Sequence, residues 1–293
     1  MRKLISSFIF ILLLLLFVPG CKKCVTIQGE FSVLTYNVAG LPEGISSSHP
    51  ELYMSSIGKL INGNGIVHVQ EDFCYHDTLL QYDTHPVHTE TTGCALVGSG
   101  LNTFSNYPMH NVYSEAWTDC TSFDCYTPKG FRYSQIDIAP GVTIDVYNAH
   151  TTAGSATASV AARNKNILQL CNYIKAHSAG RAVLIMGDLN SRYTRAGDTL
   201  TAITELGFQD VWIQLVRNNI VPPPASAVLD NCDGNRTNPD CESKDKVFYR
   251  SSDKIKLSAI SYQVDDPRFY FNNNDSLPLS DHWPVFTKFS YKA

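Results

Sequence analysis

The sequence lacks an excess of positive charge. It has 23 Lys and Arg residues against 27 Asp and Glu residues, which gives a formal net charge of −4. General nucleic-acid binding proteins draw much of their affinity from Lys and Arg contacts to phosphates, so this balance argues against that class. An enzyme with a local basic patch stays compatible with it.

Internal repeats, interdomain linkers and recurring zinc-type Cys-x-x-Cys pairs are also missing. A chain of 293 residues with 44% hydrophobic content can bury a full core. These absences favour one large domain over a repeat protein or a zinc module. We expect that domain to cover residues 25–293.

Only one long apolar run is present, at residues 4–18. Arg2 and Lys3 precede it, Pro19 and Gly20 follow it, and it is short for a membrane span. This pattern is typical of a signal peptide and predicts secretion after loss of residues 1–20. The mature chain then keeps 21 basic and 27 acidic residues, a net charge of −6. Lipid anchoring through Cys21 is the less favoured alternative, because Pro19 is unusual in a lipoprotein cleavage box.

Nine cysteines fit an exported, oxidised chain. The pairs closest in sequence are Cys120 with Cys125 and Cys232 with Cys241, and Cys74 with Cys94 is a longer candidate. The number is odd, so one thiol has no predicted partner. Asn235 and Asn274 begin glycosylation sequons, which matter in a eukaryotic host.

The most informative stretch is the apolar run 182–186, which stops at Gly187 and is followed by Asp188-Leu-Asn190. Such a run predicts a strand buried on both faces. Asp188 and Asn190 are two residues apart and therefore leave the same side of an extended segment. Gly-Asp can also be a simple turn, so the rest of the chain must decide between the two interpretations.

Hydrophobic patterns predict further strands and helices along the chain. The expected strands are 31–37, 66–70, 94–97, 134–138, 142–148, 246–249, 257–262 and 283–289. Helices are expected around 52–61 and 160–174 and from Asp198 onward. The segment 102–131 has little periodicity and gives no prediction.

Polar residues able to bind a metal or move a proton fall repeatedly at the predicted strand ends: Asn37, Glu71, His150, Asp188, Asn190, Asp281 and His282, with Asp245 at the start of its strand. Taken singly, Glu71 could start a helix, either histidine could be structural, and Asp245 could be a solvated charge. Together they predict a cleft for metal-assisted phosphoryl transfer. Mg²⁺ suits oxygen ligands and substrate phosphate, with Mn²⁺ or Ca²⁺ as alternatives.

Chemistry suggests roles for these groups. Glu71 is the best metal ligand, supported by Asn37. His282 is the natural general base, and its orienting carboxylate could be Asp281 or Asp245. We prefer Asp245, because adjacent residues on a strand point to opposite faces. His150 would stabilise charge on phosphate oxygens or protonate the leaving group.

Six motifs in this order resemble those of the endonuclease/exonuclease/phosphatase superfamily: Leu34-Thr-Tyr-Asn37, Val69-Gln-Glu71, Tyr147-Asn-Ala-His150, Gly187-Asp-Leu-Asn190, Asp245-Lys-Val and Ser280-Asp-His282-Trp-Pro. The resemblance covers about residues 30–290. It implies an α/β fold, a four-layer α-β-β-α sandwich of two packed mixed β-sheets with helices outside, and a divalent metal, usually Mg²⁺.

Carried over residue by residue, the resemblance makes Glu71 the metal ligand with Asn37 beside it, and Asp281 a helper of the metal or the histidine. Two further residues, Asp188 and Asn190, would position nucleophile and phosphate. The remaining roles are a base, its supporting carboxylate and a phosphate contact, which fall to His282, Asp245 and His150.

Substrate is predicted from weaker signals. Lys129-Gly130 is similar to the Lys-Gly element of sphingomyelinases, whose lysine approaches the phosphate. Aromatic residues of this region could insert at a membrane interface or simply pack: Tyr107, Tyr113, Trp117, Phe123 and Tyr126. We therefore favour a sphingomyelinase-like phospholipase C that acts on a phospholipid headgroup at a membrane surface.

Two other functions stay open. One is a deoxyribonuclease I-like endonuclease, in which Arg132, Arg192 and Arg195 would contact a nucleic-acid backbone. The other is a non-catalytic binding protein on the same scaffold, although every motif position holds its expected residue. No obligate protein partner is evident, and a monomer is expected.

Overall fold

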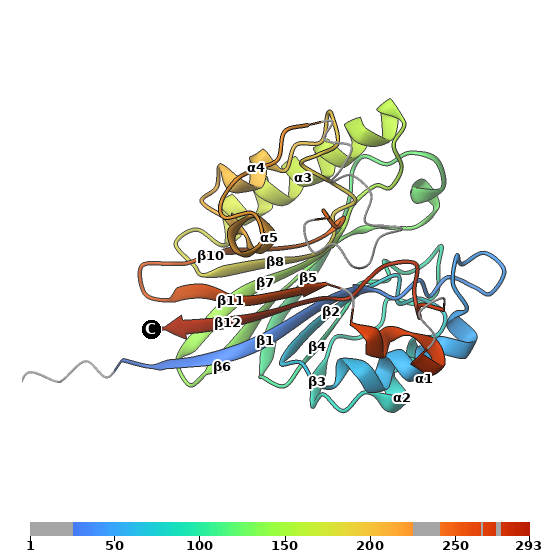
Figure 1. The fold of residues 1–293 in the computed structure, drawn as a ribbon, viewed down its shortest axis with the longest axis horizontal. Helices are drawn as coiled ribbons and strands as arrows, with labels where there is room; N and C mark the ends of the chain where they lie inside the picture. The colour runs from blue at the N-terminus through green and yellow to red at the C-terminus, as the bar shows by residue number, and fades with distance from the viewer. Residues whose placement is uncertain (1–25, 225–240, 265, 274–276) are drawn as a thin grey trace, which may run out of the picture.

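Two six-stranded β-sheets pack face to face, with helices on both outer faces (Figure 1). This arrangement, seen in a computed structural model that describes residues 26–224, 241–264, 266–273 and 277–293, confirms the predicted four-layer fold. The proposed signal peptide, Cys21, Cys232 and both sequons lie outside the described residues. None of the helices within them combines the length and apolar character that crossing a membrane requires.

The first sheet has the strand order β11-β12-β1-β2-β4-β3. Its strands are β1 (Gln28–Asn37), β2 (Ile66–Gln70), β3 (Val87–His88), β4 (Asn102–Ser105), β11 (Lys256–Val264) and β12 (Val285–Lys292). Along β1 the side chains alternate: Phe31 and Val33 face the core between the sheets, whereas Leu34 and Tyr36 join the outer core. Two helices, α1 (Pro50–Ile61) and α2 (His76–Tyr82), cover that outer face (Figure 1).

The second sheet has the order β5-β6-β7-β8-β10-β9. Its strands are β5 (Met109–Ala116), β6 (Gly130–Ala139), β7 (Val142–His150), β8 (Val183–Asp188), β9 (Gln209–Asp210) and β10 (Asp245–Arg250). Its outer face is covered by α3 (Thr157–His177), α4 (Thr201–Thr204) and α5 (Val211–Leu215). Both sheets therefore bury apolar side chains on two faces, which explains the continuous apolar run of β8.

Strand register gathers the motif residues at one edge of the sandwich. β1 and β2 are parallel and end together, with Asn37 beside Gln70. β7 and β8 are also parallel, and their last residues, His150 and Asp188, are register partners. β10 runs antiparallel to β8, so its first residue, Asp245, pairs with Asp188. Parallel strands place their carboxyl ends at the same edge, which is why distant motifs meet here.

The strand predicted at 94–97 is wrong. These residues form a turn in which the backbone N–H groups of Val97 and Gly98 donate to the Cys94 carbonyl. Leu96 has a left-handed backbone with φ +77, which a strand cannot contain. The apolar residues of this turn face solvent instead of pairing.

Two other local predictions differ from the structure. The helix expected from Asp198 is only the short α4, which begins at Thr201, and the Asp198 carboxylate before it accepts hydrogen bonds from the buried Arg163. The segment 102–131, which gave no prediction, contains β4, β5, the start of β6 and a 3₁₀-helix, η1 (Ser122–Tyr126).

Cysteine pairing agrees with the predictions where it is described. Cys74 is bonded to Cys94, and Cys120 to Cys125. Cys241 is also disulfide-bonded, while its predicted partner lies outside the described residues. Cys171 is a buried free thiol on the core-facing side of α3.

Candidate active site

Asp188 lies between two histidines at the carboxyl end of β8. Its Oδ2 atom is 3.3 Å from His150 Nε2 and 3.7 Å from His282 Nε2. All three side chains are largely buried. Residues from β7, β8 and the segment before β12 thus share one small volume, as the strand-end pattern predicted.

His282 is held on its other side by Asp245. Its Nδ1 atom lies 2.9 Å and 3.2 Å from the two Asp245 carboxylate oxygens. Ser243 donates to the same carboxylate and fixes it at the start of β10. Asp281 points elsewhere and accepts a hydrogen bond from Ser47. Of the two carboxylates considered for orienting His282, Asp245 makes the contact.

Asn37 connects the first sheet to this group. Its amide nitrogen donates to Glu71 at 3.0 Å and to Asp188 at 3.3 Å, while its oxygen accepts from the Ala39 backbone. Glu71 and Asn190 both have left-handed backbones, with φ +56 and φ +47. Asn adopts this conformation readily, whereas it strains Glu71, and strained residues concentrate at functional sites where surrounding contacts maintain them.

The environment of the site shifts the pKa values of its titratable groups strongly. Burial favours the neutral form of His150 and lowers its pKa to about 3, helped by the positive charge of Lys129. Burial acts the same way on His282, but Asp245 and Asp188 outweigh it and raise the pKa of that ring to about 10. Burial opposes ionisation of Asp188, yet the adjacent His282 and His150 hold its pKa well below the usual range. Without a metal ion, these shifts favour a neutral His150 beside a protonated His282 at neutral pH.

Lys129 stands at the mouth of the site, just before β6. Its Nζ atom pairs with Asp124 at 2.6 Å, and both residues line a cleft of about 510 Å³ that Glu71 also lines. Asp124 receives a hydrogen bond from the Ala153 backbone, at 2.6 Å, which fixes it. Lys129 is therefore held beside the site, and its approach to the substrate phosphate stays a prediction.

Asn190 turns back onto Asp188. Its backbone N–H donates to Asp188 Oδ1 at 2.9 Å, and its amide lies 3.2 Å from Oδ2 and from the Thr151 carbonyl. The amide has two N–H groups and both have acceptors here, so a phosphate oxygen or a water would have to replace one of these acceptors to bind the amide. Asp281 is exposed and outside the compact group, so it influences the site through its charge.

Arg132 and Arg192 do not form an accessible basic surface. Arg132 is buried and donates to the Glu90 and Leu101 carbonyls, and Arg192 is buried as well. Arg195 donates to the Asn190 carbonyl. Burial of Arg132 and Arg192 therefore weighs against the nucleic-acid contacts expected of them, and Arg132 also donates to backbone carbonyls inside the protein.

Sequence reasoning missed two residues that support the site. Asp124 orients Lys129, and Trp117 donates its indole N–H to the His150 carbonyl at 2.7 Å. Neither residue falls at a predicted strand end. The closely spaced cysteines around Asp124 were the only signal that its loop is fixed in place.

The donor set fits a hard divalent cation. Glu71 and Asp188 direct carboxylate oxygens toward the same Asn37 amide, and burial raises the pKa of Glu71 despite the opposing charge of Lys129. A cation would relieve this cost of burying negative charge. Asp188, Asp245 and His282 also offer ligand atoms within 4.8 Å of one another. Asp245 and His282 are also hydrogen-bonded to each other, so the geometry allows these two groups either to hold an ion or to move a proton.

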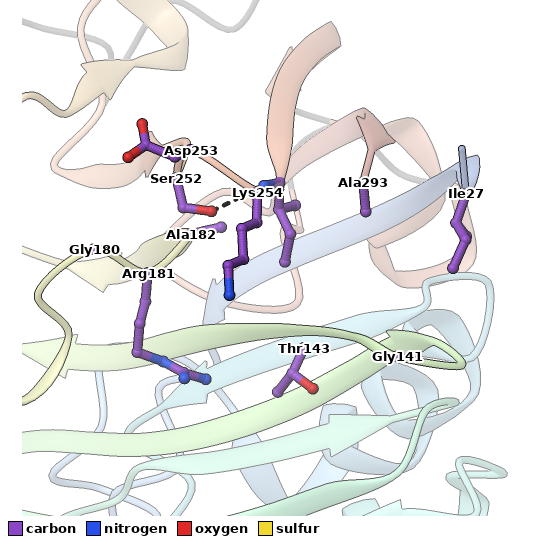
Figure 2. A pocket seen from close by; sticks show the side chains of 11 residues that line it. Ile27, Gly141, Thr143, Gly180, Arg181, Ala182, Ser252, Asp253, Lys254 and Ala293 are labelled. Atoms are coloured by element: carbon purple, nitrogen blue, oxygen red, sulfur yellow. Dashed lines mark hydrogen bonds between the residues drawn. The ribbon is translucent and has the colours of Figure 1, made fainter. Parts of the chain in front are cut away.

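A second cleft of about 540 Å³ lies at the opposite end of the sandwich (Figure 2). Its lining includes Ile27, Gly141 and Ala182, which directly precede β1, β7 and β8, whereas the site lies where these strands end. Figure 2 shows Arg181 and Lys254 extending from separate loops there. This cleft contains no predicted site residue, whereas the predicted residues gather where these strands end.

Comparison with known proteins agrees with the geometry. Residues 62–288 match the profile of endonuclease/exonuclease/phosphatase family 2. The chain belongs to the endonuclease/exonuclease/phosphatase family. Among curated proteins, this family member is 39% identical over 278 residues to sphingomyelinases of Mycobacterium bovis and Mycobacterium tuberculosis. The match covers 92% of the chain and 54% of those proteins, so the chain spans about half their length.

Solved structures share the fold at low sequence identity. Sphingomyelinase C from Streptomyces griseocarneus superposes with a TM-score of 0.62 at 18% identity, covering 89% of this family member and 99% of the other chain. A beta toxin mutant from Staphylococcus aureus with bound magnesium ions gives 0.61 at 17% identity, covering 88% and 99%. TDP2 from D. rerio, complexed with a single-strand DNA product, gives 0.62 at 17% identity, covering 89% and 98%.

Proposed function

We propose that the chain is a secreted, Mg²⁺-dependent phosphodiesterase with sphingomyelinase-like phospholipase C activity. The observation that carries this proposal is the placement of Asp188 between His150 and His282, with Glu71 joined to it through Asn37. The 39% identity to mycobacterial sphingomyelinases supports the substrate class. Secretion rests on the signal-like first 20 residues and is supported by the disulfides.

His282 is the proposed general base. Its Nε2 atom and Asp188 Oδ2 are 3.7 Å apart, too far for a direct hydrogen bond, and a water near both atoms can be bound by both. The ring takes a proton from that water while the water oxygen attacks phosphorus. The bond from phosphorus to the leaving oxygen breaks, and the released alkoxide takes a proton from solvent. Asp245 holds the opposite ring nitrogen, fixes the ring orientation and stabilises the imidazolium that forms.

Glu71 is the proposed metal ligand, with Asp188 and Asn37 beside it. A bound Mg²⁺ would neutralise charge on the phosphate oxygens and, by its positive charge, lower the pKa of nearby His282 toward the neutral form that a base requires. Ionised Glu71 is needed for this, and the cation offsets the burial that now raises its pKa. Asp281, at the rim, adds negative charge that favours the cation.

Phosphate binding falls to His150, Asn190 and Lys129. The low pKa of His150, about 3, keeps its ring neutral, so it serves as a hydrogen-bond donor to phosphate oxygens. Protonation of the leaving group by a His150 imidazolium, the other role considered for it, is disfavoured by the same low pKa. Lys129 contributes positive charge from the mouth of the site.

A nuclease is the second candidate, favoured by the structural similarity to TDP2 solved with a DNA product. It is weakened by the internal contacts of Arg132 and by the acidic composition. A non-catalytic binding protein is weaker still, because it would not need Asp245 hydrogen-bonded to His282.

The test incubates the purified protein with sphingomyelin vesicles and, separately, with plasmid DNA, each with Mg²⁺ or with a chelator. We expect phosphocholine release that the chelator stops, and intact DNA. DNA nicking without phosphocholine release would replace the lipid assignment by the nuclease. Activity on neither substrate would favour the binding protein.

A further inference from the structure

The cleft beside Lys129 continues into an apolar surface that catalysis does not use. Glu71 and Lys129 form its polar end, and the remainder is mostly apolar: Leu41, Pro42, Ile45, Phe73, Ala95, Leu96, Phe123 and Tyr126. Its volume of about 510 Å³ is sufficient for a small ligand. A substrate with its phosphate at Lys129 would therefore extend an apolar portion along this groove.

The tips of the loops around the groove are more exposed than a binding pocket requires. Phe123 is 84% exposed, Leu96 70%, Val97 76% and Ile45 71%. A single bound molecule would cover the groove walls and leave these tips in water. Contiguous exposed apolar residues around a functional site mark a surface that docks onto another apolar phase.

Two disulfides secure the loops that carry these tips. Cys120–Cys125 closes the loop of Phe123, and Cys94, bonded to Cys74, starts the turn that bears Leu96 and Val97. The first loop also contains Asp124, which pairs with Lys129. Rigid loops lose little conformational entropy on binding, which favours their use as a docking surface.

Charge on the first loop argues against binding to anionic surfaces. Lys129 and Lys165, the lysines that contact it, are paired with the loop residues Asp124 and Asp119, each at 2.6 Å. Each of these two lysines is matched by one carboxylate, so the pairs add no net positive charge to the surface. Attraction here depends on apolar burial, with Tyr126, 66% exposed, suited to the boundary between headgroups and acyl chains.

We propose that Ile45, Leu96, Val97, Phe123 and Tyr126 form a docking surface for a zwitterionic phospholipid bilayer. This inference rests on the proposed function for its choice of a lipid surface over a protein. The surface inserts apolar side chains among the headgroups and places the groove over a lipid. The lipid phosphate then lies next to Lys129 and its acyl part follows the groove walls.

The experiment measures flotation of the full chain with phosphatidylcholine–cholesterol vesicles that contain no sphingomyelin, in the presence of a chelator. The readout is therefore independent of hydrolysis. We expect wild-type binding that persists in about 0.5 M NaCl, where exposed charges are screened. The double variant Phe123→Ser/Tyr126→Ser should lower the partition coefficient at least about 10-fold, because two large apolar side chains no longer enter the bilayer.

Thermal unfolding shows whether each variant is folded. Leu96→Ser/Val97→Ser tests the second loop independently, in case the first variant is not folded. Ile220→Ser, at a site 64% exposed and outside the groove, is the matched control and should bind as wild type does. Unchanged binding by both folded loop variants would overturn the proposal. So would wild-type binding restricted to anionic vesicles and lost in high salt, or no vesicle binding at all. Vesicle binding without hydrolysis of any diester would instead contradict the proposed function and leave the docking surface standing.

Discussion

Asp245 holds the ring of His282 through a 2.9 Å hydrogen bond between segments 37 residues apart in the chain. The bond joins the first residue of β10 to the loop before β12, and thereby ties the second sheet to the first. It leaves the other ring nitrogen of His282 directed at Asp188. Proton transfer at that nitrogen depends on this geometry.

The first prediction concerns this pair. His282→Ala should lower kcat by about 10²–10⁴-fold with little change in KM, because the base acts in the transition state. Asp245→Asn should lower kcat less, since the ring remains but loses its orienting charge. Diester hydrolysis at saturating Mg²⁺ measures both. His110→Ala, from the exposed His110–Asp137 pair, is the control and should retain full activity. Full activity in His282→Ala would remove the base from the mechanism.

The second prediction is a change in pKa. Without metal, Asp245 and Asp188 raise the pKa of His282 to about 10, so its ring carries a proton at neutral pH. Asp245→Asn removes the larger of these two effects, and the pKa should fall toward that of an ordinary histidine. NMR titration of the ring resonances in chelator measures it. An unchanged pKa would mean that Asp245 does not control this ring.

The third prediction concerns the metal. Mg²⁺ at about 100 times its Kd should stabilise the folded protein by about 2.7 kcal/mol, because it binds the folded state alone. Glu71→Gln should abolish most of this stabilisation and raise the Mg²⁺ concentration needed for half-maximal activity at least about 10-fold. Thermal unfolding with and without Mg²⁺ provides a readout independent of turnover. The control is Glu51→Gln in the first turn of α1, where the response to Mg²⁺ should remain. An undiminished Mg²⁺ response in Glu71→Gln would place the ion elsewhere.

The fourth prediction is acid destabilisation through His68, which lies on β2 fully buried between the sheets. Burial lowers its pKa to about 3, below the unfolded value near 6.5. As pH falls, the unfolded state therefore binds the proton before the folded state does. The stability that is present above about pH 6.5 is lost as pH falls from there to about 3. The loss is up to about 1.4 kcal/mol per pH unit. His68→Gln cannot titrate, so its unfolding free energy should fall less steeply in this window. Chemical denaturation measures the unfolding free energy of both proteins. If the values for wild type and His68→Gln fell in parallel with pH, His68 would not have this role.

Prediction from sequence succeeded where local pattern and long-range geometry agree. The buried run of β8 is continuous, and parallel pairing with β7 places Asp188 beside His150 without further information. The same logic placed Asn37 at the end of β1. The family resemblance then supplied the layer order, which periodicity by itself does not define.

Prediction failed where tertiary contacts override the local pattern. β5 is an exposed strand in which buried and exposed residues do not alternate. Segment 102–131 therefore has no hydrophobic periodicity that would predict a strand. Residues 94–97 are apolar but follow a disulfide-bonded cysteine into a turn, and an apolar run alone does not distinguish a strand from a docking surface. The pairing of Asp124 with Lys129 depends on the shape of a closed loop. Arg132 was read as a surface charge because its backbone carbonyl partners come from distant residues.

The last prediction explains why glycine precedes Asp188. A Cβ atom at Gly187 would lie 1.9 Å from the Ala149 carbonyl oxygen, its register partner on β7. Gly187→Ala must therefore push β7 from β8 immediately before His150 and Asp188. We expect a loss of at least about 1–3 kcal/mol of stability together with a fall in kcat at saturating Mg²⁺. Gly63→Ala, where no atom lies within 4 Å of an added Cβ, is the matched control for both thermal unfolding and kinetics. If Gly187→Ala matched this control in both measurements, close packing of the two strands would not be what positions Asp188 against His150.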